Sequence, residues 1–317
     1  MKTVFVLGCN GQDGTLMCKS LLEKKLKVIG LTRKSTKDLS NHVKIGIRGE
    51  VEIIHGDINN FKTILNLIEK YRPNVIYNLA AQSSVGKSFS EPIETIETIV
   101  SGTINILEAC KQLSFDGSLF FAGSSEIFGN TEKPADINYK QNPLNPYSIG
   151  KQSSFNLVKM YRESNNINCV TGVLCNHESQ LRSDEFVTQK IISGALKCSL
   201  NKSHKLELGN IDVARDWGWA AEYVEAMQRI ANTEKPTDYV ICTGKLNKLK
   251  TFIKIAFNKL DLNWENHINS NKNLYRKTDI KQNFGDPTRL KNDLDWEAKI
   301  HLEEIIEKLI EHKIKEY

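Results

Sequence analysis

The sequence predicts an α/β fold in which helices cover a doubly wound parallel sheet and a smaller C-terminal lobe closes over one edge of it. Two observations predict this fold. Short, continuous apolar runs alternate with segments of helical apolar spacing up to about residue 176, which is typical of βαβ units. A glycine-rich turn, "GCNGQDG", directly follows the first apolar run and opens the first helical segment.

Each apolar run is short enough for a strand, and each intervening segment is long enough for a helix. The runs are apolar throughout, as expected for strands that are covered on both faces. Right-handed crossovers then bring the carboxyl ends of the strands to one edge, where ligands bind in such sheets. We expect strands at residues 3–8, 27–33, 51–57, 74–81, 118–124 and 168–176, and helices at 15–26, 61–71, 97–113 and 145–165.

After residue 176 the pattern loosens into shorter segments, such as 186–197 and 217–231. The chain closes with a lysine- and glutamate-rich segment, about 298–316, whose spacing favours an amphipathic helix. We therefore predict a sheet domain over residues 1–176. Residues 177–317 are predicted to form mainly a substrate-binding lobe, with some segments returning to the first domain.

The composition limits the class of protein. The chain has 317 residues, of which 40% are apolar and 26% charged, and its net charge of +5 is spread along the sequence. We expect no nucleic-acid partner, whereas a mild positive balance suits an anionic small molecule. No run approaches the ~18 apolar residues of a membrane span. The seven cysteines form no CxxC pair and the chain opens on a strand, so we expect reduced thiols, no metal site, no signal peptide and a cytoplasmic location.

The glycine-rich turn predicts a dinucleotide site of the Rossmann type. Its three glycines follow a strand and open a helix, which is the context that this motif requires. Glycines let the backbone approach a pyrophosphate, and the helix N-terminus offers N–H groups and positive potential. The alternative is a tight turn without a ligand. The predicted loop comprises Gly8, Asn10, Gly11, Gln12, Asp13 and Gly14.

The end of the second strand indicates which dinucleotide binds. A site selective for NAD usually places an acidic residue here, but this strand runs into "LTRKST". Arg33, Lys34 and Ser35 suit a 2′-phosphate, so we predict NADP(H); the alternative is a solvated basic loop. Asp57, after the third strand, could accept a hydrogen bond from the adenine amino group. The predicted cofactor wall also includes Ile58, Leu79, Ala80 and Ala81.

Tyr147 and Lys151 are predicted to form a hydride-transfer pair. They lie four residues apart on the helix predicted at 145–165, so they share one face. A phenol with a pKa near 10 is a weak base at neutral pH. A nearby ammonium and the positive nicotinamide would lower that pKa. Ser124, at the end of the fifth strand, could hold the substrate alcohol while Tyr147 takes its proton.

The stretch "GSSEIFG" places Glu126 two residues after the buried strand at 118–124. An ionised carboxylate in such a place is costly unless a partner or a reaction uses it. If this site oxidises an alcohol, the new ketone acidifies the proton on the adjacent carbon. Glu126 could take that proton and so allow a neighbouring hydroxyl to leave as water. The alternative is a structural ion pair.

The chain resembles the GDP-mannose 4,6-dehydratases, which are extended short-chain dehydrogenases/reductases. The resemblance runs from residue 6 to about 296 through stretches that include "GCNGQDGTL", "YNLAAQSSVGKSF", "GSSEIFG", "NPYSIGK", "LCNHES" and "LGNIDVARDWGWAAEYVEAM". It implies that Ser124, Ser125 and Glu126 supply acid and base groups. It also implies a hydro-lyase that turns a GDP-hexose into a GDP-4-keto-6-deoxyhexose, with the hydride returning to C6.

The resemblance also implies the residues that hold the substrate. Asn176 would contact the diphosphate of the sugar nucleotide, while His177 and Arg182 would lie near the nicotinamide cofactor. Each cation considered alone has a surface alternative, and a lone histidine has the alternative of a structural hydrogen bond. The substrate residues expected from the resemblance are Ser83, Ser84, Asn176, Lys190, Arg215 and Arg276.

Three departures from the family pattern bear on substrate and assembly. Gln180–Ser183, "QLRS", replaces a Pro-Arg-Arg-Gly loop that reaches a neighbouring subunit in the family, so a dimer and a tetramer are both open. Ser84 replaces a frequent histidine, and Ala214 replaces a basic residue. A smaller side chain at position 84 suits a GDP-manno-heptose as an alternative substrate. A nucleotide-sugar epimerase or reductase and a non-catalytic NADP-binding sensor are the remaining alternatives.

Overall fold

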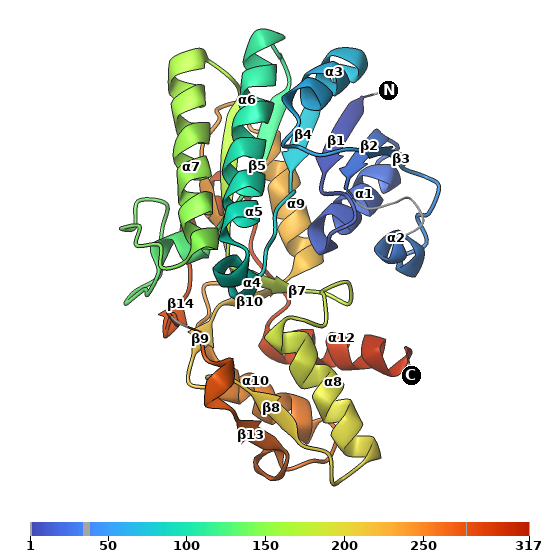
Figure 1. Cartoon of the computed structure of the whole chain (residues 1–317), viewed down its shortest axis with the longest axis vertical. Helices are drawn as coiled ribbons and strands as arrows, with labels where there is room; N and C mark the ends of the chain where they lie inside the picture. Colours follow the sequence, from blue (N-terminus) through green and yellow to red (C-terminus); the bar gives the residue numbers. More distant parts are fainter. Residues whose placement is uncertain (1, 34–38, 277, 317) are drawn as a thin grey trace.

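A computed structural model describes residues 2–33, 39–276 and 278–316. Its centre is a seven-stranded sheet in the order β11-β6-β5-β4-β1-β2-β3, in which all neighbouring strands are parallel (Figure 1). The predicted fold class is confirmed. The strands are β1 Thr3–Leu7, β2 Lys27–Thr32, β3 Glu52–His55, β4 Val75–Asn78, β5 Ser118–Ser124, β6 Cys169–Leu174 and β11 Tyr239–Ile241.

The sheet is covered on both faces. On one face α1 and α9 pack around Met17, Tyr223 and Met227, and on the other α3, α6 and α7 pack around Ile64, Ile106 and other apolar side chains. All seven residues of β5 are buried, which explains why the strand runs are apolar throughout. The covering helices are α1 Gln12–Glu23, α3 Phe61–Tyr71, α6 Gly102–Gln112, α7 Pro146–Asn165 and α9 Ala220–Ala231.

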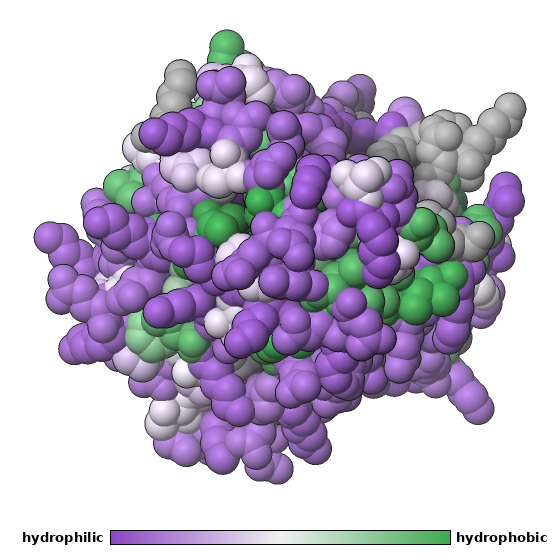
Figure 2. Space-filling view, turned by 90° about the horizontal axis from the view of Figure 1, so that it is seen from below, coloured by the Kyte–Doolittle hydropathy of each residue, from purple (hydrophilic) through white to green (hydrophobic). Residues whose placement is uncertain are grey.

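The second lobe has an apolar core of its own. The core packs α8, α10 and α12 around buried residues such as Phe252 and Trp217. This lobe lies beyond the carboxyl ends of the strands (Figure 1), and its outer face, seen from below, is mostly hydrophilic with smaller hydrophobic areas (Figure 2). Its elements are α8 Val187–Leu200, α10 Leu249–Asn258, α12 Leu302–Ile314, β8 Leu206–Leu208, β9 Ala214–Arg215, β12 Asn247–Lys248, β13 Ile268–Ser270 and β14 Gln282–Asn283.

Two predicted segments change conformation part-way. The segment 97–113 begins as a π-helical turn, Glu97–Ser101, before α6. The segment 217–231 begins as β10 Trp217–Trp219, which pairs in parallel with β7 Asn176–Glu178 before α9 starts. Pairing with a distant strand overrides the local helical spacing there. The elements absent from the prediction include α2 Ser40–Lys44, α4 Val85–Ser90, α5 Pro92–Ile96 and α11 Thr288–Leu294.

The seven cysteines are all buried and free. In the three described stretches of chain, no helix has both the length and the apolar character needed to cross a bilayer.

Candidate active site

A cleft of about 590 Å³ lies between the carboxyl edge of the sheet and the second lobe. It brings together residues from the glycine loop, the end of β5, the start of α7 and the second lobe. Edges of this kind are where ligands bind in doubly wound sheets. The predicted residues that line it are Gly8, Gly11, Gln12, Asp13, Gly14, Leu79, Ala81, Ser83, Ser84, Ser124, Ser125, Glu126, Tyr147, Lys151, Asn176, His177, Arg182, Lys190, Arg215 and Arg276.

Other predicted cofactor residues lie beside the cleft rather than along it. Arg33 is exposed and pairs with Glu94 at 3.1 Å. Asp57 accepts a hydrogen bond from the Asn59 backbone, so its carboxylate organises its own turn. Lys34 and Ser35 lie outside the described residues. Asn10 and Ile58 are buried, and Ala80 packs against the glycine loop.

The glycine loop fits a pyrophosphate. Gly8 has a φ of +83°, and a Cβ there would lie 2.9 Å from the backbone of Ala80. A Cβ at Gly14 would lie 2.2 Å from the Gly8 carbonyl oxygen. Only glycine therefore lets the loop and the first turn of α1 pack this closely. The helix begins after Gly11 without a side-chain cap, so its first N–H groups can bind an anion.

Tyr147 and Ser124 meet at the floor of the cleft. Tyr147 is 9% exposed on the first turn of α7. Burial raises the pKa of Tyr147 to about 12, while its hydrogen bond with Ser124 acts in the opposite direction. The sequence argument predicted a lowered pKa with the neighbouring ammonium and the bound nicotinamide together; in the protein alone, the cost of burying a phenolate dominates. In the protein alone the phenol is therefore protonated at neutral pH.

Lys151 lies one helical turn beyond Tyr147, on the same face. Its ammonium donates to the Ala122 carbonyl at 2.6 Å and lies 4.9 Å from the centre of the Phe121 ring and 5.7 Å from that of Tyr147. Burial lowers the pKa of Lys151 to about 7, and the charge of Asp13 opposes this. The group can therefore exchange a proton near neutral pH.

Glu126 lies on the 3₁₀ turn Ser125–Phe128, directly after β5. Its backbone N–H donates to the Ser124 hydroxyl at 3.3 Å, and its Oε2 accepts from Asn145 Nδ2 at 3.2 Å. Among the described residues no cation lies within 4.0 Å of its carboxylate, so the structural ion pair is not formed there. The nearby Arg215 donates instead to two backbone carbonyls, at 2.9 and 2.8 Å.

Arg215 contributes positive charge beside this carboxylate. Its side chain is 6% exposed on β9. Burial lowers the pKa of Arg215, and the charge of Glu126 opposes that shift. A guanidinium does not lose its proton in proteins. The cleft therefore holds a fixed cation next to Glu126. Lys190 and Arg276 are exposed at the rim.

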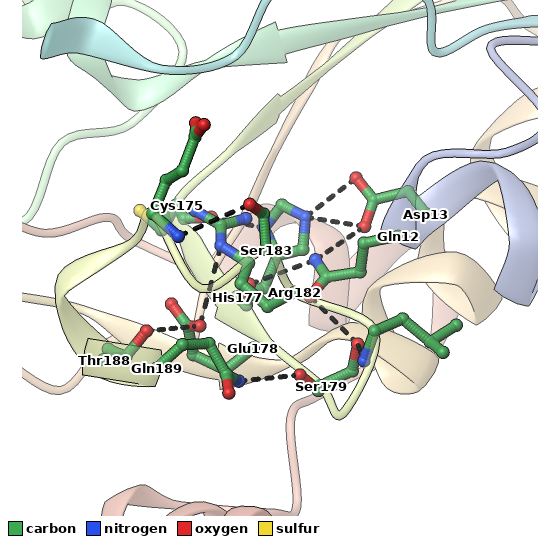
Figure 3. Close-up of polar contacts among 12 residues, drawn as sticks. Gln12, Asp13, Cys175, His177, Glu178, Ser179, Arg182, Ser183, Thr188 and Gln189 are labelled. Carbon is green, nitrogen blue, oxygen red and sulfur yellow. Dashed lines mark hydrogen bonds and ion pairs between the residues drawn. The ribbon is translucent and has the colours of Figure 1, made fainter. Parts of the chain in front are cut away.

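His177 connects the second lobe to the glycine loop (Figure 3). Its Nε2 lies 2.9 Å from Asp13 Oδ2, and its Nδ1 lies 2.7 Å from the Cys175 carbonyl oxygen. Both partners can only accept, so the two contacts are satisfied together by an imidazolium. Burial opposes that charge, but Asp13 outweighs it and raises the pKa of His177. The ring also stacks on Tyr223, with 4.8 Å between centres.

Gln12 and Ser179 strengthen the same junction (Figure 3). Gln12 donates to the His177 carbonyl at 3.2 Å and accepts from the Ser179 hydroxyl at 2.9 Å. Arg182 lies 3.6 Å from Glu178 Oε2 and stacks on Phe186 at 3.7 Å. The Arg182 guanidinium therefore has two partners, Glu178 and Phe186, within its own chain.

The comparison with known proteins identifies the family. The family model described as GDP-mannose 4,6 dehydratase matches residues 5–309. The chain belongs to the GDP-mannose 4,6-dehydratase family. It is 33% identical to GDP-mannose 4,6 dehydratase 1 of Arabidopsis thaliana, over 99% of the chain and 90% of that protein. It is 30% identical to the Homo sapiens GDP-mannose 4,6 dehydratase, over 96% and 89%.

Solved structures of other proteins have the same fold as this chain. UDP-glucose 4-epimerase of Thermotoga maritima has a TM-score of 0.88 at 19% identity, with 99% of each chain covered. RMD of Pseudomonas aeruginosa, solved with NADPH, has a TM-score of 0.81 at 20% identity, with 100% of each chain covered.

The sequence analysis did not identify Asn145 as a residue of the site. The residue is the N-cap of α7 and the partner of the Glu126 carboxylate. An asparagine before a proline that opens a helix is a recognisable capping signal. Its contact with Glu126 could not be foreseen, because 19 residues separate the two along the chain.

Proposed function

We propose that this protein is a GDP-mannose-type 4,6-dehydratase, a hydro-lyase that converts a GDP-hexose into a GDP-4-keto-6-deoxyhexose. One observation carries the proposal beyond the family match. Glu126 faces the same cleft as Tyr147 and Lys151, and its carboxylate is held by an amide rather than consumed by an ion pair. An enzyme that only oxidises C4 has no use for such a base.

The side chains divide the reaction between them. Tyr147 takes the proton of the C4 hydroxyl, which Ser124 orients, and Lys151 balances the charge that develops on the phenol. Glu126 then removes the C5 proton, which the C4 ketone has made acidic, and passes a proton to the C6 hydroxyl, which leaves as water; C5 takes up a proton again when hydride reaches C6. A nicotinamide cofactor bound beside Tyr147 and Lys151 would supply the hydride acceptor for C4 and the hydride donor for C6.

We propose NADP as the cofactor. The glycine loop and the uncapped start of α1 suit the pyrophosphate, and Arg33 lies at the end of β2, where the 2′-phosphate of the adenosine ribose would lie. Lys34 and Ser35 are assigned to the same phosphate on the sequence argument alone. A cytoplasmic location is supported by the free cysteines.

We propose that the GDP-sugar lies between Asn176, Arg215 and the rim cations Lys190 and Arg276. Donors and cations of this kind suit a diphosphate. Ser83 and Ser84 would face the sugar. Because Ser84 is small and its hydroxyl caps α4, a GDP-manno-heptose with a larger C6 substituent is the second candidate substrate.

We propose a homo-oligomer, a dimer or a tetramer. Ile149 and Met160 are exposed on α7 and lie three turns apart on one face, and Ile93 is 73% exposed on α5, which packs against α7. Exposed apolar side chains on two helices that pack together suit contact with a second copy.

The deciding experiment incubates the protein with GDP-mannose and GDP-manno-heptose separately, and follows loss of water by mass spectrometry. We expect one of them to lose one water and, in heavy water, to gain deuterium at C5. Glu126→Gln should abolish the C5 exchange and keep partial C4 oxidation. Loss of water from neither substrate by protein with bound cofactor would overturn the proposal. Full loss of water in Glu126→Gln would exclude Glu126 as the base, whereas a wild-type protein that oxidises C4 without losing water would favour an epimerase or reductase.

A further inference from the structure

Asn145 connects the start of α7, which carries Tyr147, with the 3₁₀ turn that carries Glu126. Its side chain is 3% exposed. The Oδ1 atom accepts from the Ser148 backbone N–H at 2.8 Å, and the Nδ2 atom donates to Glu126 Oε2 at 3.2 Å. A backbone N–H only donates, so the cap fixes which atom of the amide faces Glu126. The amide therefore presents a donor to the carboxylate.

The proposed reaction needs such a connection. Its two bases act on the C4 hydroxyl and on the neighbouring C5 proton, so their separation must be held closely. Tyr147 stands on α7, whereas Glu126 stands on the turn after β5. Asn283 fixes the backbone of that turn by donating to the carbonyls of Ser125 and Gly129, both at 2.9 Å. The carboxylate itself lies at the end of a flexible, part-exposed side chain.

We propose that Asn145 is a positioning residue that holds the Glu126 carboxylate at a fixed place relative to Tyr147, two residues further along α7. This inference rests on the proposed dehydratase function and adds a role to it. One amide caps the helix that carries the first base and hydrogen-bonds the second base. A shift of α7 thus moves both bases together, and the step at C5 stays aligned with the step at C4.

Ser148 offers a matched control. Its hydroxyl accepts from the backbone N–H groups of Leu144 and Asn145, both at 3.1 Å, and completes the capping box. Ser148→Ala therefore weakens the same cap and leaves the amide of Asn145 on Glu126. Asn145→Ser keeps an N-cap oxygen, so the helix still starts normally, but one hydroxyl is too short to reach the carboxylate as well.

The test measures two partial reactions in a single turnover of the holoenzyme with its GDP-sugar. Reduced-cofactor absorbance reports C4 oxidation, and deuterium uptake reports C5 exchange. Asn145→Ser should lower the ratio of C5 exchange to C4 oxidation by about 10- to 100-fold, the effect of a misplaced group. Ser148→Ala should lower the melting temperature and leave that ratio within about twofold of wild type.

Asn145→Asp supplies a readout that a purely structural cap would not move. It retains the cap but places a second carboxylate against Glu126, which disfavours ionisation of the pair. The C5 exchange should then require a higher pH, with recovery as pH rises, while C4 oxidation keeps its pH profile. A wild-type ratio in Asn145→Ser, or an unshifted profile in Asn145→Asp, would overturn the role of Asn145. Absence of dehydration in the wild-type protein would instead overturn the proposed function.

Discussion

His177 Nε2 lies 2.9 Å from Asp13 Oδ2, and this contact ties the first turn of α1 to the strand that leads into the second lobe. Both side chains are largely buried, at 9% and 20% side-chain exposure. The other ring nitrogen, Nδ1, also faces an acceptor, so both nitrogens need a proton to make their hydrogen bonds. The pair is therefore a buried salt bridge between an imidazolium and a carboxylate. It fixes the glycine loop relative to the residues that would face the nicotinamide and the sugar.

Removal of one partner should therefore destabilise the fold. Asp13→Asn leaves an imidazolium without its counter-charge, and breaking a buried pair in this way costs about 3 kcal/mol. Chemical denaturation should show this loss in the free energy of unfolding. Glu304→Gln is the control, because its pair with Lys308 is exposed and should contribute less than about 0.5 kcal/mol. Equal effects of the two changes would contradict the assignment.

The same pair predicts a pH window. Asp13 raises the pKa of His177, so its contribution to stability is present below about 6.5 and is lost as pH rises through the folded-state value. Burial opposes ionisation of Asp13, but His177 outweighs it and lowers the pKa of that carboxyl. Its contribution is present above about 3.9 and lost as pH falls. The stability difference between wild type and Asp13→Asn should therefore be greatest between about pH 4 and 6.5. A flat difference would exclude the ion pair.

Tyr147→Phe should leave the fold intact and slow C4 oxidation by about 10²- to 10⁴-fold, the usual contribution of a positioned acid–base group. Transient absorbance of the reduced cofactor measures this step. The variant lacks the phenol, so any pH dependence of C4 oxidation that comes from ionisation of Tyr147 should be absent from its residual rate. Unchanged turnover would exclude Tyr147 as the base.

Lys151→Met should separate stability from activity. The pKa of Lys151 is lowered to about 7 by burial, so between about pH 7 and 10.4 the unfolded chain binds more protons and stability rises with pH. The methionine variant should be at least as stable as wild type at pH 7, should lack this slope, and should lose C4 oxidation. Thermal melts at several pH values check the first two points. A variant that unfolds more easily at pH 7 would contradict them.

Arg162 and Asp238 should matter for stability and not for chemistry. They form a two-pronged pair at 2.8 and 2.6 Å, and Asp238 also accepts from the Thr171 backbone at 2.7 Å. Arg162→Met leaves the Asp238 carboxylate, which is 7% exposed, without its counter-charge. This should lower the free energy of unfolding by about 3–5 kcal/mol. Activity at low temperature should be kept. Arg289→Met, which breaks an exposed pair, is the control.

Local pattern was enough to predict six of the seven sheet strands, the helix that carries Tyr147, and the gathering of Ser124, Glu126 and Tyr147 at one edge. Those features follow from spacing along the chain and from the rule that parallel strands end together. The pairing of residues 217–219 with 176–178, the seventh strand and the contact of Asn145 with Glu126 depend on residues far apart in the sequence. The raised pKa of Tyr147 in the protein alone could not be predicted either, because burial is a property of the packed molecule.

The seventh strand sets a limit on how this chain can be divided. Tyr239, Val240 and Ile241 complete the sheet beside β6, and Asn283 anchors the turn that bears Glu126. A fragment that ends at residue 176 would expose the unpaired edge of β6, which favours aggregation. It would also lose the hydrogen bonds by which Asn283 fixes the turn that bears Glu126. We therefore expect that residues 1–176 do not fold as an independent unit, and that fusion tags are best placed at the termini of the whole chain.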